Sequence, residues 1–309
     1  MTSRKPPLDP RITEQRNPRT EAIDLASPLQ IVDLINAEDR SVAAAVATQR
    51  ECIARAIELA EQAFRAGGRL FYIGAGTSGR LGVLDASECP PTFGTDAQMV
   101  QGLIAGGIAA LTQAQEGAED DPENARRDVA SREVDGKDFV IGIAASGTTT
   151  YVRAGLAEAM QRGAATGIVA CSPPPPEVVR LVDVAIVPVT GPEVVTGSTR
   201  MKAGTATKMV LNMITTGAMI RMGKTFGNLM VDLKATNNKL RDRSERILME
   251  VCGIEREEAR RLLAAAGGHV KTAIAMKKLG VERAGAEKAL EEGGGVIRRV
   301  TREEPPPVR

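Results

Sequence analysis

Short apolar runs alternate with helical patterns through the first two thirds of the chain. Five runs have the length and character of buried strands, at residues 69–73, 99–104, 139–143, 166–170 and 184–189. Apolar side chains recur at helical spacing in the stretches between, at residues 43–66, 151–162 and from Ser198 or Thr199 to about Met222. Strands that alternate with helices are typical of a parallel sheet covered on both faces. We therefore predict an α/β fold built on a five-stranded parallel sheet.

After Gly227 the pattern changes to helix alone. Two segments, starting at Gly253 and Gly280, each run for the same length to a glycine pair, which indicates a degenerate repeat. A small helical domain is therefore predicted after the sheet domain. The predicted organisation is a mobile N-terminal arm, a sheet domain, a charged linker helix, a small helical domain and a disordered tail, at residues 1–15, 16–227, 228–252, 253–300 and 301–309.

A turn rich in glycine and hydroxyl groups follows the first and the third predicted strands. The first copy reads Gly-Ala-Gly-Thr-Ser-Gly-Arg over residues 74–80, and the second reads Ala-Ala-Ser-Gly-Thr-Thr-Thr over residues 144–150. Such loops let backbone N–H groups close around an anion at a helix N-terminus, and Ser and Thr add neutral donors. Because the carboxyl ends of parallel strands meet at one edge, both turns are predicted to line one phosphate site. Glu88 follows the first turn closely and supplies a carboxylate.

Composition excludes several classes of function. The 309 residues are 43% apolar and only 2% aromatic, and the formal net charge is +1, which gives no reason to expect nucleic acid or a membrane surface as partner. No apolar run approaches the roughly 20 residues that span a bilayer, and the polar N-terminus lacks the apolar centre of a signal peptide. We expect a cytoplasmic protein. The four cysteines are widely spaced, which predicts neither a disulfide framework nor a zinc site.

The single histidine, His269, limits the chemistry further. A Ser-His or Cys-His nucleophile needs a base within hydrogen-bond reach, and histidine metal sites need several such ligands. Acid and base work is left to carboxylates, Lys, Tyr or Cys. The carboxylate candidates are Glu88 and the acidic cluster at residues 116–121, in which either Glu116 or Glu119 could face a ligand.

Gly74, Gly76 and Gly79 also satisfy the dinucleotide-binding pattern GxGxxG. That fingerprint needs an acidic residue at the end of the second strand to bind the ribose, and here the strand runs into Ala105-Gly106-Gly107. A nicotinamide-dependent dehydrogenase is therefore an alternative that the sequence disfavours.

Seven motifs of the chain match one known family, and they lie at residues 12–21, 74–80, 84–94, 102–107, 116–120, 191–205 and 226–232. Through these motifs the chain resembles the N-acetylmuramic acid 6-phosphate etherase family. The resemblance extends from about Ile12 to Val300. It implies a sugar isomerase-type domain with a flavodoxin-like parallel sheet, followed by a small helical domain similar to ubiquitin-associated modules. It also implies a homodimer that needs no cofactor or metal. The activity implied is cleavage of the D-lactyl ether of N-acetylmuramic acid 6-phosphate, giving N-acetylglucosamine 6-phosphate and D-lactate in cell-wall recycling.

The resemblance also implies roles for individual residues. The family's proton donor falls on Glu88 and its second catalytic carboxylate on Glu119. The substrate and its phosphate would be bound by the two turns and one later serine: Gly76, Thr77, Ser78, Gly79, Ser146, Gly147, Thr148, Thr149 and Ser198. Three positions depart from the family pattern, because Thr148, Thr150 and Ile108 stand where arginine, proline and glutamate are usual. Loss of the arginine removes a positive charge next to the second turn.

Two other functions on the same fold remain open from the sequence. One is a non-catalytic sugar-phosphate-binding regulator, similar to the glucokinase regulatory protein. The other is an aldose–ketose phosphosugar isomerase, which also uses a carboxylate at C2 of the sugar. Release of D-lactate distinguishes the etherase from both.

Overall fold

The computed structural model describes residues 9–232 and 238–304, which divide into two compact units. The first unit comprises Met1–Ser87 and Gln98–Thr215, and the second comprises Glu88–Ala97 and Thr216–Arg309. Within the described ranges, no helix is long and apolar enough to cross a membrane.

The first unit contains the predicted five-stranded parallel sheet, in the order β2-β1-β3-β4-β5. The strands are β1 (Leu70–Gly74), β2 (Val100–Ile104), β3 (Phe139–Ile143), β4 (Ala165–Val169) and β5 (Val184–Ile186). Each lies where the apolar runs predict it, although β5 ends three residues before the predicted limit of 189. The order places β1 and β3 side by side, so the loops that follow them meet at one edge of the sheet.

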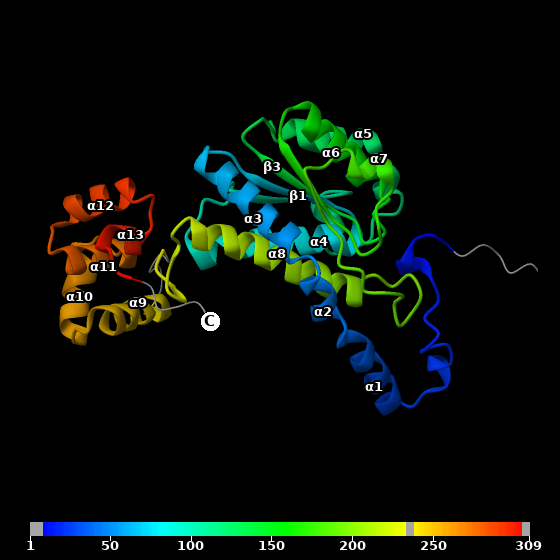
Figure 1. The fold of residues 1–309 in the computed structure, drawn as a ribbon, viewed down its shortest axis with the longest axis horizontal. Helices are drawn as coiled ribbons and strands as arrows, with labels where there is room; N and C mark the ends of the chain where they lie inside the picture. Colours follow the sequence, from blue (N-terminus) through cyan, green and yellow to red (C-terminus); the bar gives the residue numbers. More distant parts are fainter. Residues whose placement is uncertain (1–8, 233–237, 305–309) are drawn as a thin grey trace, which may run out of the picture. The chain divides into compact units, whose positions relative to one another are not determined.

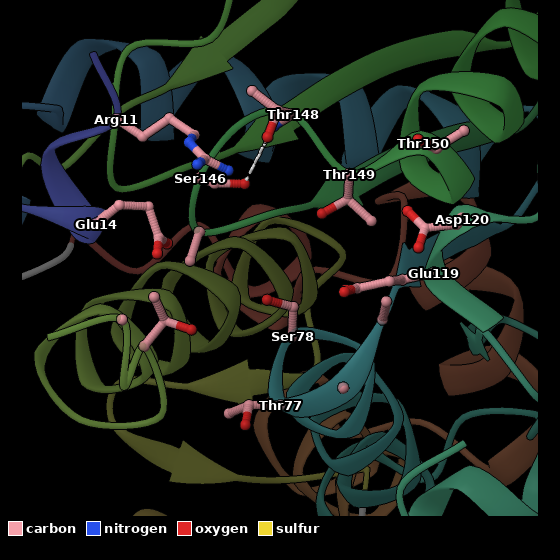
Figure 2. A pocket seen from close by; sticks show the side chains of 15 residues that line it. Arg11, Glu14, Thr77, Ser78, Glu119, Asp120, Ser146, Thr148, Thr149 and Thr150 are labelled. Carbon is pink, nitrogen blue, oxygen red and sulfur yellow. Dashed lines mark hydrogen bonds between the residues drawn. The ribbon is translucent and has the colours of Figure 1, made fainter. Parts of the chain in front are cut away.

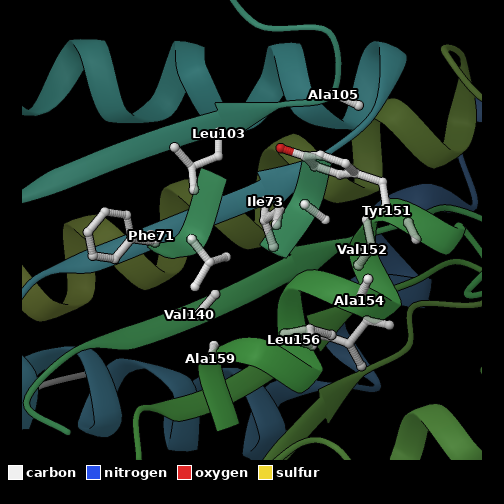
Figure 3. Close-up of a cluster of buried hydrophobic side chains, with 14 of the residues drawn as sticks. Phe71, Ile73, Leu103, Ala105, Val140, Tyr151, Val152, Ala154, Leu156 and Ala159 are labelled. Carbon is white, nitrogen blue, oxygen red and sulfur yellow. The ribbon is translucent and has the colours of Figure 1, made fainter. Parts of the chain in front are cut away.

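Helices cover both faces of the sheet (Figure 1). On one face lie α5 (Pro122–Ser131) and α6 (Thr150–Gln161), and on the other lie α3 (Arg50–Arg65), α4 (Gly76–Phe93) and α8 (Lys202–Arg221). The remaining helices of the unit are α1 (Pro28–Asp39), α2 (Val42–Ala47) and α7 (Pro176–Val179). Four short 3-10 helices add to them: Ile12–Glu14, Ile23–Leu25, Ile108–Leu111 and Ala118–Asp120. Alternate β1 residues face opposite layers: Phe71 and Ile73 pack in the core under α6, which Figure 3 shows.

Two helix predictions differ from the structure. The helix predicted at 43–66 is broken between α2 and α3, where Gln49 leaves helical geometry and its side-chain oxygen accepts a hydrogen bond from the N–H of Val187 at 2.9 Å. The helix predicted from Ser198 or Thr199 begins at Lys202 instead. Its first N–H groups, of Lys202 and Ala203, donate to the buried Glu193 carboxylate at 3.0 and 2.9 Å, so a glutamate takes the place of the predicted Ser or Thr cap.

The N-terminal segment is packed against the first unit rather than free of it. Residues 1–8 of the predicted mobile arm lie outside the described residues, but Thr13 is fully buried and its N–H donates to Ser172 Oγ at 3.2 Å. Asn17 and Thr20 follow, with side chains that donate to the carbonyls of Pro192 and Val194. These bonds attach residues 13–20 to Ser172, which follows β4, and to the loop that precedes α8.

A buried ion pair completes this attachment. Lys202 is 0% exposed, and its Nζ donates to Glu38 Oε2 at 2.6 Å. Arg19 donates to the same carboxylate from the N-terminal segment. Hydrogen bonding by Arg19, followed by Lys202, lowers the pKa of Glu38 to about 2. Since this folded-state pKa lies below the unfolded value near 4.5, the stability contributed by the ionised carboxylate is lost as the pH falls from about 4.5 to about 2.

We expect Glu38→Gln to destabilise the fold by about 3 kcal/mol or more, because it leaves the Lys202 ammonium buried without its carboxylate. Urea unfolding at neutral pH measures the change. The matched control is Glu51→Gln, which removes an exposed pair with Arg50 at 3.7 Å and is expected to change stability by less than about 1 kcal/mol. Equal unfolding midpoints for the two variants would contradict the assignment.

The second unit contains the predicted small helical domain. Its helices are α9 (Asn238–Cys252), α10 (Arg256–Ala265), α11 (Val270–Leu279), α12 (Arg283–Glu292) and α13 (Ile297–Thr301). The predicted repeat is present, since α10 and α12 begin three residues after Gly253 and Gly280, which both have positive φ. A core of its own, centred on Leu248, Ala273 and Ile274, lies among these helices.

Two details of this unit differ from the helix-only prediction. A short antiparallel hairpin, β6 (Thr225–Phe226) and β7 (Leu229–Met230), lies where the linker helix was expected to begin, and residues 233–237 of that helix lie outside the described residues. Gly227 has a φ of +58°, which suits the two-residue hairpin turn. In the predicted disordered tail, Glu303 pairs with Lys278 at 2.5 Å, whereas residues 305–309 lie outside the described residues.

Candidate functional site

The first glycine turn connects β1 to α4 with close backbone packing. A Cβ on Gly79 would lie 2.7 Å from the carbonyl oxygen of Gly74 and 2.6 Å from Ile104 Cγ1, so only glycine permits this approach. Helix α4 begins at Gly76, which has a φ of +52°. Thr77 and Ser78 therefore lie in the first turn of α4, where N–H groups without helical partners face outwards and favour an anion.

The second turn connects β3 to α6 in a similar manner. Gly147 has a φ of +75°, and a Cβ there would lie 2.9 Å from Pro174 Cα. Ser146 Oγ lies 3.0 Å from Thr148 Oγ1 and accepts a hydrogen bond from the Thr148 N–H at 3.3 Å. Helix α6 then begins at Thr150, so a second helix N-terminus is directed at the same edge of the sheet.

The two turns line one pocket of about 440 Å³ (Figure 2). Its lining is dominated by hydroxyl groups, glycines and charged side chains: Arg11, Glu14, Ala75, Gly76, Thr77, Ser78, Glu119, Asp120, Ala145, Ser146, Thr148, Thr149, Thr150, Gly197 and Thr199. Arg11 and Glu14 enter from the N-terminal segment, and Glu119 and Asp120 enter from the 3-10 helix before α5 (Figure 2). Neutral donors, two helix N-termini and carboxylates in one hollow suit a phosphorylated ligand and acid–base chemistry on it.

A second hollow of about 330 Å³ shares part of this lining. Ala75, Gly76 and Glu119 line both, and the second hollow adds Arg80 and Glu116. Arg80 is held there by a hydrogen bond from its Nε to the Leu111 carbonyl at 3.1 Å. Glu119 is therefore the carboxylate that reaches both hollows, whereas Glu116 lines only the second.

Of the residues predicted for the site, the structure gathers seven around the main pocket: Gly76, Thr77, Ser78, Glu119, Ser146, Thr148 and Thr149. Gly79 and Gly147 shape the turns without lining the pocket. Ser198 does not line it either, although its neighbours Gly197 and Thr199 do. Of the three departures from the family pattern, Thr148 and Thr150 line the pocket, while Ile108 is 87% exposed and lines neither hollow.

Glu88 also lies away from the pocket lining. It is on α4, 12 residues after Gly76, which corresponds to about 18 Å along the helix axis. Its side chain is exposed, as is that of Leu84 one turn earlier on the same helix face. Of the two predicted catalytic carboxylates, only Glu119 lines the hollows described above.

Arg11 and Glu14 were missed from the sequence as site residues. Nothing in their local pattern indicates a role, because they reach the pocket through long-range contacts of the N-terminal segment. The resemblance over residues 12–21 includes Glu14 without giving it a role, and it does not include Arg11.

Comparisons with known proteins identify the family of the chain. A family model described as the glucokinase regulatory protein N-terminal SIS domain matches residues 51–160. The N-acetylmuramic acid 6-phosphate etherase of Rhodopirellula baltica is 57% identical over 267 residues, which cover 86% of this chain and 88% of that protein. The chain belongs to the N-acetylmuramic acid 6-phosphate etherase family.

A second member of the etherase family, from Geobacillus sp., is 51% identical over 292 residues that cover 94% of this chain and 99% of that protein. Among solved structures, a putative phosphosugar isomerase involved in capsule formation from Bacteroides fragilis is much more distant. It is 19% identical with a TM-score of 0.47, and the match covers 62% of this chain and 91% of that one. The family assignment made from the sequence motifs is thus confirmed by relatives that match almost the whole chain.

Proposed function

We propose that this protein is a carbon–oxygen lyase that cleaves the D-lactyl ether of N-acetylmuramic acid 6-phosphate, giving N-acetylglucosamine 6-phosphate and D-lactate in cell-wall recycling. The observation that carries the proposal is the placement of Glu119 in a pocket built from two hydroxyl-bearing helix N-termini, in a chain 57% identical to a named etherase. The two turns bind the phosphate, and Glu119 lies where it can reach the sugar.

An elimination followed by hydration accounts for the use of carboxylates. In the open-chain sugar, the C1 aldehyde acidifies the C2 proton, and a carboxylate removes it. The C3–O bond breaks as the ether oxygen receives a proton from a carboxylic acid, so lactate leaves and a C2=C3 double bond forms. Water then adds its oxygen to C3, and C2 takes back a proton. Each positioned acid or base contributes about 10²–10⁴-fold to such a reaction.

We assign Glu88 and Glu119 to these proton transfers, and we propose that the working enzyme is a homodimer in which Glu88 of a second copy reaches the pocket. The support is that Glu119 lines both hollows, whereas Glu88 lines neither. Exposed apolar side chains also favour a covering partner. Leu84 is 50% exposed beside Glu88, and Leu29 on α1 is 71% exposed.

The second hollow offers a place for the lactyl group. Its cation, Arg80, is suited to a carboxylate, and Glu119 lies between this hollow and the phosphate pocket. With the phosphate at the Ser/Thr turns and the lactyl carboxylate near Arg80, the ether bond would lie beside Glu119. Since a phosphorylated sugar does not cross a bilayer unaided, we place the reaction in the cytoplasm.

We expect the purified protein to release D-lactate from N-acetylmuramic acid 6-phosphate, as measured with a coupled D-lactate dehydrogenase assay. In D₂O the product should carry deuterium at C2, and in H₂¹⁸O it should carry ¹⁸O at C3, because the elimination exchanges both positions. Direct displacement at the lactyl carbon would label neither.

Two other results would replace the proposal. Binding of the sugar phosphate without D-lactate release would identify a regulator, in keeping with the partial match to the glucokinase regulatory protein domain. Interconversion of aldose and ketose phosphates without D-lactate would identify an isomerase.

A further inference from the structure

The main pocket has an unfavourable charge balance for the ligand that its turns suit. Three carboxylates line it, those of Glu14, Glu119 and Asp120, and among its lining residues only Arg11 has a cationic side chain. A phosphate monoester carries a charge of about −1.5 to −2 near neutral pH. Neutral hydroxyl groups and backbone amides orient such a group, but they do not offset several nearby negative charges. The charge of Arg11 is therefore important for the affinity of the pocket.

Arg11 lies near the second turn because the residues that follow it are bonded to a neighbour of that turn. Two residues later, the Thr13 N–H donates to Ser172 Oγ, and the Ser172 N–H donates to the Ala145 carbonyl next to Ser146. The guanidinium extends towards Ser146 and Thr148 in the pocket (Figure 2). The N-terminal segment and the second turn are thus joined through Ser172, with Arg11 directed at the hydroxyl groups of the turn.

Asp9 orients the guanidinium of Arg11 but accepts hydrogen bonds from only two of its three nitrogens. Arg11 Nε and Nη2 donate to the two Asp9 oxygens at 2.9 and 2.6 Å, and the Arg11 backbone N–H donates to Oδ1 at 2.8 Å. Hydrogen bonding by Arg11 lowers the pKa of Asp9 to about 2, so the pair is ionised at neutral pH. The third guanidinium nitrogen, Nη1, has no acceptor among the described residues. It is available to an anion in the pocket, and the planar group is already fixed in direction.

We propose that Arg11 is a phosphate-binding, specificity-determining residue of this chain, which supplies from the N-terminal segment the positive charge that the second turn lacks at Thr148. This inference rests on the proposed function for the identity of the sugar. The binding of a phosphate group by Arg11 does not depend on that function. Arg11 binds the phosphate oxygens next to Ser146, and Asp9 positions it. Its contribution is to ground-state binding, because the phosphate does not change during the elimination.

Titration calorimetry with N-acetylglucosamine 6-phosphate and with inorganic phosphate tests the proposal. Arg11→Ala is expected to weaken both by about tenfold, the effect of losing a charge-assisted hydrogen bond, and Arg11→Lys by less. The matched control is Arg16→Ala, an exposed arginine of the same segment that does not line the pocket, with unchanged affinity expected. In kinetics, Arg11→Ala should raise KM for the sugar phosphate by about the same factor with little change in kcat.

A charge relocation makes the test specific. Adding Thr148→Arg to Arg11→Ala returns a guanidinium to the pocket from the second turn, and it should recover most of the lost affinity. Unchanged affinity in Arg11→Ala, or no phosphate binding by the natural protein, would overturn the inference. Failure of the proposed function is a separate result: phosphate affinity that depends on Arg11, without D-lactate release, would leave the inference standing and remove the etherase.

Discussion

Glu119→Gln is expected to lower the rate of D-lactate release by about 10²–10⁴-fold, because the amide keeps the shape of the side chain but transfers no proton. The loss should appear in kcat, with KM changed little, since the proposed role of Glu119 is proton transfer at the sugar and not phosphate binding. Its side chain is exposed at the rim of both hollows, so the thermal midpoint of the variant should match that of the natural protein. Steady-state kinetics and a melting curve measure the two quantities.

The control for this variant is Glu123→Gln, which removes an exposed glutamate in the first turn of α5 and should leave turnover unchanged. A second comparison distinguishes the two acidic candidates of the sequence. If Glu116→Gln abolished turnover while Glu119→Gln retained it, the carboxylate that lines only the second hollow would be the catalytic one, and the assignment of Glu119 would be wrong.

Mixing two inactive variants should restore activity. Glu88→Gln is expected to lower turnover by about 10²–10⁴-fold, as Glu119→Gln does. If each site combines Glu119 of one copy with Glu88 of another, then a mixed dimer has one site with both glutamates and one with neither. Unfolding and refolding an equimolar mixture should therefore recover about a quarter of the natural activity, because about half of the dimers are mixed and each has one complete site of two.

The recovery has to depend on subunit exchange. Variants mixed without unfolding should stay inactive until the subunits exchange, and size-exclusion chromatography with light scattering should give the mass of a dimer. A refolded mixture that stays inactive, although each variant alone binds the sugar phosphate, would show that Glu88 and Glu119 do not combine across copies.

The sequence predicts the sheet well because its strands are buried on both faces and read as nearly continuous apolar runs. All five strands and their parallel pairing are confirmed. Where prediction failed, a distant partner decided the local structure. Gln49 breaks a continuous helical pattern to satisfy the N–H of Val187, and Glu193 caps α8 in place of a nearby hydroxyl residue. The hairpin β6–β7 has strands of two residues each, which are too short to show the alternation of apolar and polar residues that predicts a strand.

In the candidate site, too, prediction fails where contacts between residues far apart in the sequence decide the structure. Thr77, Ser78, Ser146 and Thr149 were predictable because each follows a recognisable strand, and the sheet order then brings them together. Arg11 belongs to a segment without periodicity, and it reaches the pocket only because residues far along the chain bind that segment. Glu88 shows the converse: a motif assigned it a role, but Glu88 lines neither hollow in the described residues, so that role stays a prediction.

The convergence of α4 and α6 on one pocket has a consequence for how such a site changes over evolutionary time. The donors at the two helix N-termini are peptide groups, and they remain whatever side chains surround them. Side chains at the rim can therefore drift, and a positive charge can move from one segment to another, while the phosphate stays anchored. The sugar attached to the phosphate is then free to vary, so the same phosphate-binding site can be used for many different sugars.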